Sequence, residues 1–149
     1  MRDEPTTPDE EVVTLVGLRE EPLSVDEVLE AVRHPACGGI AVFIGVVRDH
    51  DHERDVTRLD YSAHPTALDT LARVCRTVAE RSEAVRLAAV HRVGTLEIGD
   101  TAVVAAVAAR HRGQAFAACR DLIDTLKAEV PIWKHQLFTD GVSEWVGMP

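Results

Sequence analysis

The stretch QAFAACRDLIDTLKAEVPIWKHQLF, residues 114–138, holds the clearest change from helix to strand in this chain. Apolar residues recur at helical spacing in its first part, namely Phe116, Cys119, Ile123, Leu126 and Val130. Pro131 ends the predicted helix, because helical backbone is disfavoured at the residue before a proline. The segment IWKHQLF is then expected to be a strand, and the Asp-Gly pair at 140–141 predicts a hairpin to a last strand, VSEWV.

Two apolar runs lie upstream of this helix. VRLAAVHRVG (85–94) and TAVVAAVAAR (101–110) each predict a strand, and TLEIGD connects them. Before them a second helix is expected after Pro65, since proline costs little in the first turn of a helix. The apolar face of that helix is formed by Leu68, Leu71, Val74, Cys75 and Val78.

The first half of the chain predicts three more strands and one more helix. VVTLVGL (12–18) is expected to be a strand, and LSVDEVLEAVRHP (23–35) a helix in which Ser24 fits the N-cap of a capping box. GGIAVFIGVV (38–47) is apolar and rich in β-branched residues, which favours a buried strand. VTRLDYS (56–62) is expected to be the strand that follows a charged loop.

These elements follow one another in the order βαββαββαββ. Strands that are adjacent in the sequence favour antiparallel pairing, so the predicted class is α+β, in two layers with a mainly antiparallel sheet. No linker or repeat divides the chain, and residues 12–149 are expected to form a single domain. Residues 1–11 are acidic, contain two prolines and are expected to be a flexible tail.

Composition narrows the classes of function. The net charge of −9 argues against a nucleic-acid partner, because such partners require a basic field, but it permits a small anion in a local basic pocket. No apolar run reaches the length of a membrane span and the first residues are polar, so we expect a cytoplasmic protein without a membrane partner. The three cysteines lack metal-site spacing, and Cys75 and Cys119 are expected in the core.

The only two lysines of the chain, Lys127 and Lys134, lie on either side of Pro131. If the chain reverses at the proline, both ammonium groups can reach one pocket. Arginine stays charged in proteins, whereas lysine can lose a proton beside another cation and act as an acid, a base or a nucleophile. A purely structural interpretation stays open, in which Lys127 stabilises the helix dipole and Lys134 is a surface residue.

Three further groups lie at predicted strand ends. His111 and Arg112 follow the strand 101–110 immediately before a helix begins, where backbone N–H groups attract anions. Arg48 follows the strand 38–47 in the same way. Alone, Arg48 can be a solvated loop charge and His111 a capping or core residue. Together with the two lysines, these groups predict one cationic cavity in an acidic protein.

Other kinds of site gain little support. The loop DHDHERD (49–55) offers His50 and His52, but no third ligand follows at a zinc-site spacing, so no metal is expected. The chain has no Gly-x-Ser-x-Gly, no Gly-x-Gly-x-x-Gly and no Walker loop. We therefore expect no nucleotide cofactor and no serine triad.

The segments FIGVVRDH, VHRVGTLEIGDTAVV and ARHRGQAFAACRDLIDTLKAEVPIWKHQ, with a later WV, resemble the catalytic (large) subunit of molybdopterin synthase. The resemblance covers roughly residues 12–146, and its most specific part is the succession of HRVGTLEIGD, HRGQAF and LKAEVPIWK. It implies an α/β hammerhead-type fold. It also implies conversion of cyclic pyranopterin monophosphate into molybdopterin, in molybdenum cofactor biosynthesis.

The resemblance further implies partners and residue roles. Sulfur would come from the C-terminal thiocarboxylate of a small ubiquitin-like subunit that ends in Gly-Gly, and two such subunits would flank a homodimer to give a heterotetramer. By motif, Lys127 and Lys134 take the positions of the catalytic lysines, while Arg48, His111 and Arg112 take those of substrate-binding residues. The segment YSAHP (61–65) departs from the family, which often has Glu and Tyr before this proline.

A non-catalytic function is the alternative. The same cationic cavity could belong to an α+β oligomer or scaffold that binds an anionic small molecule. In that case only the charge of the lysines matters, and arginine should replace either of them at little cost.

Overall fold

The structure, a computed structural model, describes residues 11–51, 54–139 and 141–146. The predicted flexible tail, apart from Glu11, lies outside the described residues, as do His52 and Asp140. The elements are β1 Val13–Arg19, α1 Val25–Val32, β2 Gly39–Val46, β3 His50–Asp51, β4 Arg54–Ala63, α2 Ala67–Arg81, β5 Arg86–Arg92, β6 Gly94–Glu97, β7 Thr101–Ala109, α3 Arg112–Glu129, β8 Ile132–Phe138 and β9 Ser143–Val146.

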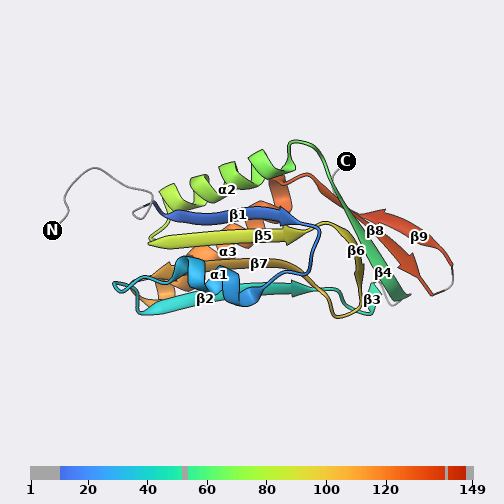
Figure 1. The fold of residues 1–149 in the computed structure, drawn as a ribbon, viewed down its shortest axis with the longest axis horizontal. Helices are drawn as coiled ribbons and strands as arrows, with labels where there is room; N and C mark the ends of the chain where they lie inside the picture. The colour runs from blue at the N-terminus through green and yellow to red at the C-terminus, as the bar shows by residue number, and fades with distance from the viewer. Residues whose placement is uncertain (1–10, 52–53, 140, 147–149) are drawn as a thin grey trace.

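The main sheet has four strands in the order β1-β5-β7-β2. β1 runs parallel to β5, whereas β5 and β2 both pair antiparallel with β7. Helices α2 and α3 cover one face of this sheet and α1 covers the other (Figure 1). The α+β class is confirmed, and α1 adds a further layer to the expected pair of layers.

Strand β7 is the centre of the core because helices cover both of its faces. Its successive side chains point to opposite faces, as in any strand. Val103, Ala105 and Val107 pack with α2 and α3, whereas Val104 and Ala106 pack with α1. The small alanine side chains allow the helices to approach the sheet closely.

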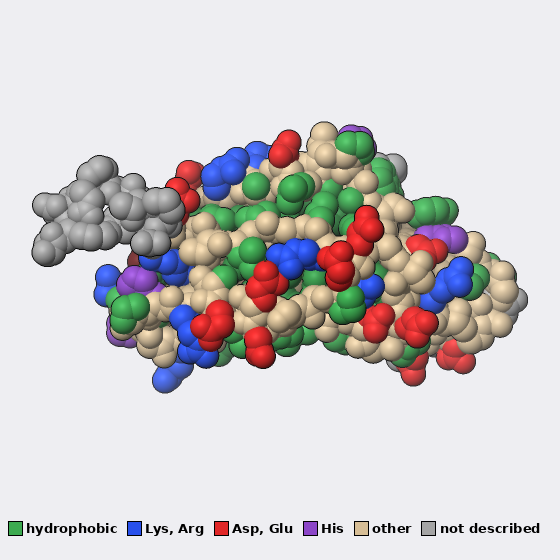
Figure 2. Space-filling view, viewed as in Figure 1, with side chains coloured by type: hydrophobic (Ala, Val, Ile, Leu, Met, Phe, Trp, Pro, Cys, Tyr) green, Lys and Arg blue, Asp and Glu red, His purple; other side chains and the backbone are tan. Residues whose placement is uncertain are grey.

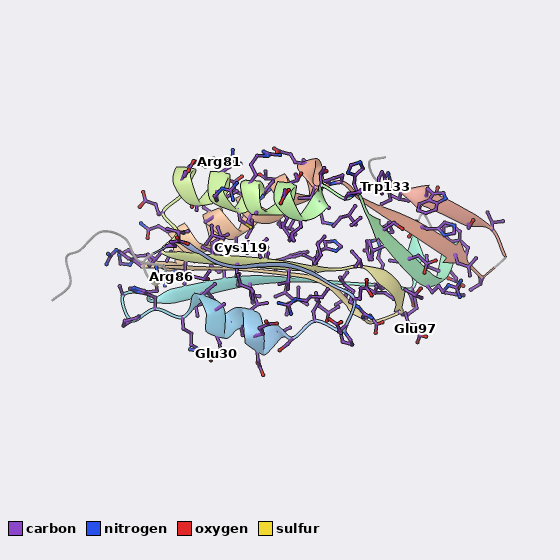
Figure 3. All side chains as sticks on the ribbon, turned by 45° about the horizontal axis from the view of Figure 1, so that its top comes forward. Glu30, Arg81, Arg86, Glu97, Cys119 and Trp133 are labelled. Carbon is purple, nitrogen blue, oxygen red and sulfur yellow. The ribbon has the colours of Figure 1, made fainter. Side chains whose placement is uncertain are left out.

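The predicted core cysteines are buried as expected. Cys75 and Cys119 are buried free thiols. Cys119 lies between α3 and the main sheet, with its Sγ 3.7 Å from the carbonyl oxygen of Ala105 (Figure 3). Burial raises the pKa of both thiols, that of Cys75 to about 12, so they serve as small apolar core residues.

A second sheet extends from one end of the main sheet (Figure 1). Its order is β3-β4-β8-β9, and β6 pairs with β4. The connection TLEIGD thus contributes part of a strand that the sequence did not predict. This strand, β6, begins at Gly94, whose φ of 96° favours glycine, and it pairs with β4 instead of the main sheet. Leu59, Leu96 and Phe138 form the core of this second sheet.

The prediction for β2 needs a correction. The apolar run 38–47 was expected to be buried, but β2 is the edge strand of the main sheet, and its face beside α1 is open. Four side chains on that face are 39–56% exposed, namely Ile40, Val42, Ile44 and Val46. The reason is the short helix α1, whose buried residues pack over β5 and β7 and not over β2.

Local sequence signals explain the helix ends. The Ser24 side chain accepts a hydrogen bond from the backbone N–H of Glu27 at the start of α1. α3 ends at Glu129, and the backbone N–H of Val130 still donates to the carbonyl oxygen of Leu126. Pro131 follows, and the chain turns into β8 as predicted.

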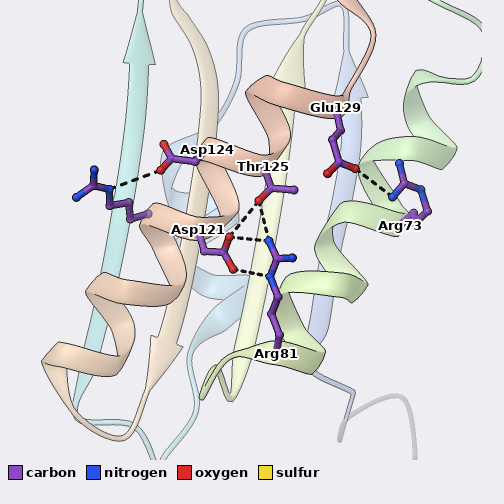
Figure 4. A network of polar contacts seen from close by, with 7 residues as sticks. Arg73, Arg81, Asp121, Asp124, Thr125 and Glu129 are labelled. Carbon is purple, nitrogen blue, oxygen red and sulfur yellow. Dashed lines mark hydrogen bonds and ion pairs between the residues drawn. The ribbon is translucent and has the colours of Figure 1, made fainter.

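Polar contacts join α2 to the C-terminal half of α3 (Figure 4). Arg81 donates two hydrogen bonds to the Asp121 carboxylate, at 2.8 and 2.7 Å, and a third to Thr125. Arg73 pairs with Glu129 at 3.1 Å. These groups are partly exposed, and solvent screens their charges, so the apolar α2–α3 contact dominates.

The face seen in Figure 2 carries Asp and Glu side chains interspersed with Lys and Arg side chains. It has no extended basic field of the kind that binds nucleic acid. Among the described residues, no helix is long and apolar enough to cross a membrane.

The α2 contact can be tested with two leucines of the same helix. Leu71 is fully buried, so Leu71→Ala should lower the free energy of unfolding by about 2–5 kcal/mol, the usual cost of such a cavity. Leu68 is 45% exposed, and Leu68→Ala should cost about 1 kcal/mol or less. Urea unfolding measures both values. Equal losses would show that this face of α2 is not the core contact.

Candidate functional site

A cavity of about 530 Å³ lies where the end of the main sheet meets the second sheet. Strand ends, the last turn of α3 and strand β8 line it. The walls are partly apolar, with Phe43, Leu59 and Val103 among them. A cavity of this size, with apolar walls and a few convergent polar groups, is typical of a small-molecule site.

Both lysines line this cavity. Lys127 lies in the last turn of α3, and Lys134 lies on β8, where it pairs with Tyr61 of β4. The turn at Pro131 reverses the chain between them, so two groups from different elements reach the same space. This is the convergence that the sequence predicted.

Arg48 is the third cation of the cavity. It follows β2, whose register against β7 shifts between Gly45 and Val46. Gly45 allows β2 to lie close to β7 at this point, because a Cβ there would lie 2.7 Å from a methyl carbon of Val103. The backbone N–H of Val47 then donates to the backbone carbonyl oxygen of Asp100. This hydrogen bond fixes the start of the loop and places Arg48 at the cavity.

No acidic side chain is found among the described residues that line the cavity. Three cations, Lys127, Lys134 and Arg48, line this one space in a protein whose net charge is −9. Several cations around one partly apolar space attract an anion. The cavity is therefore suited to an anionic substrate.

His111 and Arg112 do not line this cavity. They stand at the N-terminal end of α3, beside Gly39 at the start of β2. α3 begins at Arg112, and the rise of an α-helix from there to Lys127 is about 22 Å. The expectation that all five groups share one cavity is not met within a single chain, because α3 carries two of them on one end and a lysine on the other.

His111 also has a structural role at its position. It is the N-cap residue of α3, and its backbone N–H donates to the side-chain oxygen of Gln114 at 3.3 Å. Both His111 and Arg112 are exposed to solvent.

The sequence analysis missed one titratable group of the cavity, His91 of β5. Its side chain follows Leu87 and Ala89 on the sheet face that α2 and α3 cover, and the residue is only 8% exposed. Its ring meets that of Tyr61 edge to face, with centroids 5.1 Å apart. The signal that could have found it was a histidine at the end of the apolar run LAAV, in the same alternation as Leu87 and Ala89.

Burial lowers the pKa of His91 to about 4. A hydrogen bond with the carbonyl oxygen of Arg92 opposes this shift, and the charge of Lys127 adds to it. The imidazole is therefore neutral at pH 7. Burial also raises the pKa of Tyr61, so the phenol keeps its proton.

No cluster of three metal-ligating side chains occurs in the described parts of the chain. The loop 49–55, which offered two histidines, includes positions outside the described residues. The cavity cations are poor metal ligands while protonated, so the described site is an anion site by its chemistry.

Comparisons with known proteins identify relatives of this chain. The sequence model of the family described as MoaE protein matches residues 18–129. Molybdopterin synthase catalytic subunit 1 of Mycobacterium tuberculosis is 50% identical over 131 residues, which is 87% of this chain and 88% of that protein. The human molybdopterin synthase catalytic subunit is 34% identical over 134 residues, 89% of this chain and 71% of that protein.

Solved structures of molybdopterin synthase subunits have a similar fold. The crystal structure of molybdopterin synthase from Staphylococcus aureus has a TM-score of 0.80 at 32% identity, covering 88% of this chain and 96% of that one. A protein-protein complex of subunits 1 and 2 of molybdopterin-converting factor from Helicobacter pylori contains a chain with a TM-score of 0.65 at 22% identity, covering 92% and 90%. The latter likeness concerns the fold alone.

The buried imidazole predicts a pH dependence of stability. The unfolded chain binds a proton near pH 6.5 and the folded chain only near pH 4, so stability is lost as the pH falls through this range. At about pH 4.5 the loss from His91 should be about 2–3 kcal/mol relative to pH 7.

The measurement compares wild type with His91→Gln by urea unfolding at both pH values. Acid also weakens other groups, such as Asp121, whose pKa is lowered by Arg81, but both proteins share them. The free-energy difference between the two proteins should therefore shift in favour of the variant at low pH. A difference that is independent of pH would contradict a neutral buried His91.

Proposed function

Because this chain belongs to the MoaE protein family, we propose that it is the catalytic subunit of a molybdopterin synthase. The observation that carries the proposal is the cavity that Lys127, Lys134 and Arg48 line together. The reaction is the conversion of cyclic pyranopterin monophosphate into molybdopterin, with two sulfur atoms added as a dithiolene. Both the substrate and the sulfur donor are anions, which suits three cations.

The sulfur donor is a thiocarboxylate at the end of a small ubiquitin-like subunit. Its Gly-Gly tail is narrow enough to enter a cavity that opens between two sheets. The relatives are named catalytic subunits, which agrees with a second kind of subunit in the enzyme. We also propose the cytoplasm as its location, on composition alone.

Each cation has a proposed role. Lys127 polarises the thiocarboxylate and stabilises the negative charge that develops on its oxygen, as cationic groups do at acyl-transfer transition states. Lys134 exchanges a proton with the substrate oxygen that leaves, which arginine cannot do. Arg48 holds the cyclic phosphate with its planar guanidinium group.

The positions of His111 and Arg112 are explained by a homodimer. β2 spans about 25 Å, with Arg112 at its first residue and the cavity at its last. A two-fold axis through the middle of β2 exchanges these two ends, because symmetric dimers use the same patch on both chains. Arg112 and His111 of one copy then approach the cavity of the other and complete its anion site.

The open face of β2 supports this dimer. Ile40, Val42, Ile44 and Val46 form an exposed apolar stripe, and among the described residues no strand pairs with the outer edge of β2. Contiguous apolar surface of this kind marks contacts between proteins. The stripe runs along β2, and the proposed two-fold axis exchanges the two ends of this strand.

Replacement of Lys127 distinguishes an enzyme from a binding protein. Lys127→Ala and Lys127→Arg should each reduce molybdopterin formation by about 10²-fold or more, because the larger planar guanidinium cannot place its charge where the compact ammonium group stabilises the oxyanion. Dithiolene product is measured after incubation with pyranopterin and thiocarboxylated carrier. Arg120→Ala, on an 85% exposed side chain of the same helix, is the matched control and should retain activity.

If Lys127→Arg keeps full turnover, the catalytic role of the amine is wrong. Circular dichroism and carrier binding, measured on the same samples, separate this result from misfolding.

Mixed dimers test whether Arg112 acts across the interface. Lys127→Ala and Arg112→Ala chains should each be inactive alone. In co-expressed mixtures, half of the dimers are mixed and one of their two cavities combines intact residues from both chains, so activity should return to about a quarter of wild type. Absence of any recovery, with mixed dimers shown by mass spectrometry, would place Arg112 outside its partner's site.

A further inference from the structure

His91 presents an unused acceptor to the cavity. Its Nδ1 lies 2.7 Å from the carbonyl oxygen of Arg92. A carbonyl oxygen can only accept, so Nδ1 carries the proton and donates, and Nε2 keeps a free lone pair. Among the described residues, no hydrogen-bond partner is found for Nε2 of this buried side chain.

The groups around His91 are donors. Lys127 approaches from α3 and lowers its pKa, and Tyr61 packs against its ring from β4. Lys134 and Arg48 line the same cavity. A neutral histidine with a fixed tautomer is thus placed among cations and a protonated phenol, and it offers a basic ring-nitrogen lone pair that the cations lack.

We propose that His91 is a further catalytic residue, which uses Nε2 to orient and deprotonate the water that releases the carrier tail. The proposal rests on the function proposed above. After the thiocarboxylate sulfur has bonded to the pterin side chain, that sulfur still joins the pterin to the tail carbonyl carbon as a thioester. The tail has to be cut off before the product can leave.

The proposed step is the hydrolysis of this thioester. The oxygen of water forms a bond to the tail carbonyl carbon, and the bond between that carbon and sulfur breaks. The electron pair of the broken bond stays on sulfur, which becomes the thiolate of the product. One proton of the water passes to Nε2 of His91 and from there to solvent, and the tail leaves as a carboxylic acid that ionises in water.

Substrate binding strengthens this base. In the free protein, burial and the Lys127 charge both oppose a proton on His91. Bound phosphate and thiocarboxylate place negative charge beside Lys127, and nearby negative charge favours the protonated imidazole. His91 therefore becomes a better base when the cavity is filled, while the empty site keeps it neutral.

The test separates release of the tail from attachment of sulfur. In His91→Phe the ring shape stays and the acceptor is lost. A single turnover with pyranopterin and thiocarboxylated carrier should then accumulate the carrier–pterin thioester, seen by intact mass. Product formation should fall by about 10²-fold or more, the usual contribution of a general base. Hydroxylamine, which attacks thioesters without a base, should release the tail as a hydroxamate and restore the thiolate.

The controls give each failure a distinct result. His34→Gln, at a histidine that does not line the cavity, should accumulate no adduct and form product normally. If His91→Phe loses product without accumulating adduct, while its unfolding and carrier binding match wild type, His91 does not act in release. If the wild-type protein forms neither adduct nor product under the same conditions, the proposed function itself fails.

Discussion

The packing of α3 along β7 and β2 is the constraint on which the site depends. α3 is held by apolar contacts from Ala118 and Leu122, both buried against the main sheet and α2. This contact fixes the helix axis along the sheet, so the helix length decides what each end can reach. Its last turn brings Lys127 to the cavity, and its first residue carries Arg112 to the far end of β2. In the proposed dimer, Lys127 and Arg112 of one helix would therefore serve two different cavities.

The electrostatics of the cavity follow from its position between the sheets. The protein is acidic overall, yet the described residues that line this space include three cations and no carboxylate. Partly apolar walls reduce the screening of these charges by water, so they attract an anion more strongly than surface residues would. The same environment keeps His91 neutral. In the proposed mechanism the cations bind the anionic substrates, and the neutral His91 accepts a proton.

The sequence predicted the three helices and every strand except β3 and β6, because the signals of these elements are local. Pro131 and the helical spacing before it located the turn between the two lysines, and Ser24 marked the start of α1. The exposed face of β2 could not be predicted in this way, because an apolar β-branched run looks the same whether a helix or another molecule covers it. The separation of Arg112 from Lys127 depends on the axis of α3, which only the tertiary packing defines. His91 looked like one polar residue in a core strand, and its proximity to Lys127 is a contact between distant segments.

The most direct measurement is a crystal structure of this chain in complex with a small ubiquitin-like carrier that ends in Gly-Gly. Our account predicts that the tail enters the cavity and that its terminal carboxylate, in the place of the thiocarboxylate, lies about 3 Å from Nζ of Lys127. The carboxylate should also face Lys134 and Arg48 across the space left for the pterin. A tail that ends on another surface, with both lysines remote from its last carbon, would contradict the account.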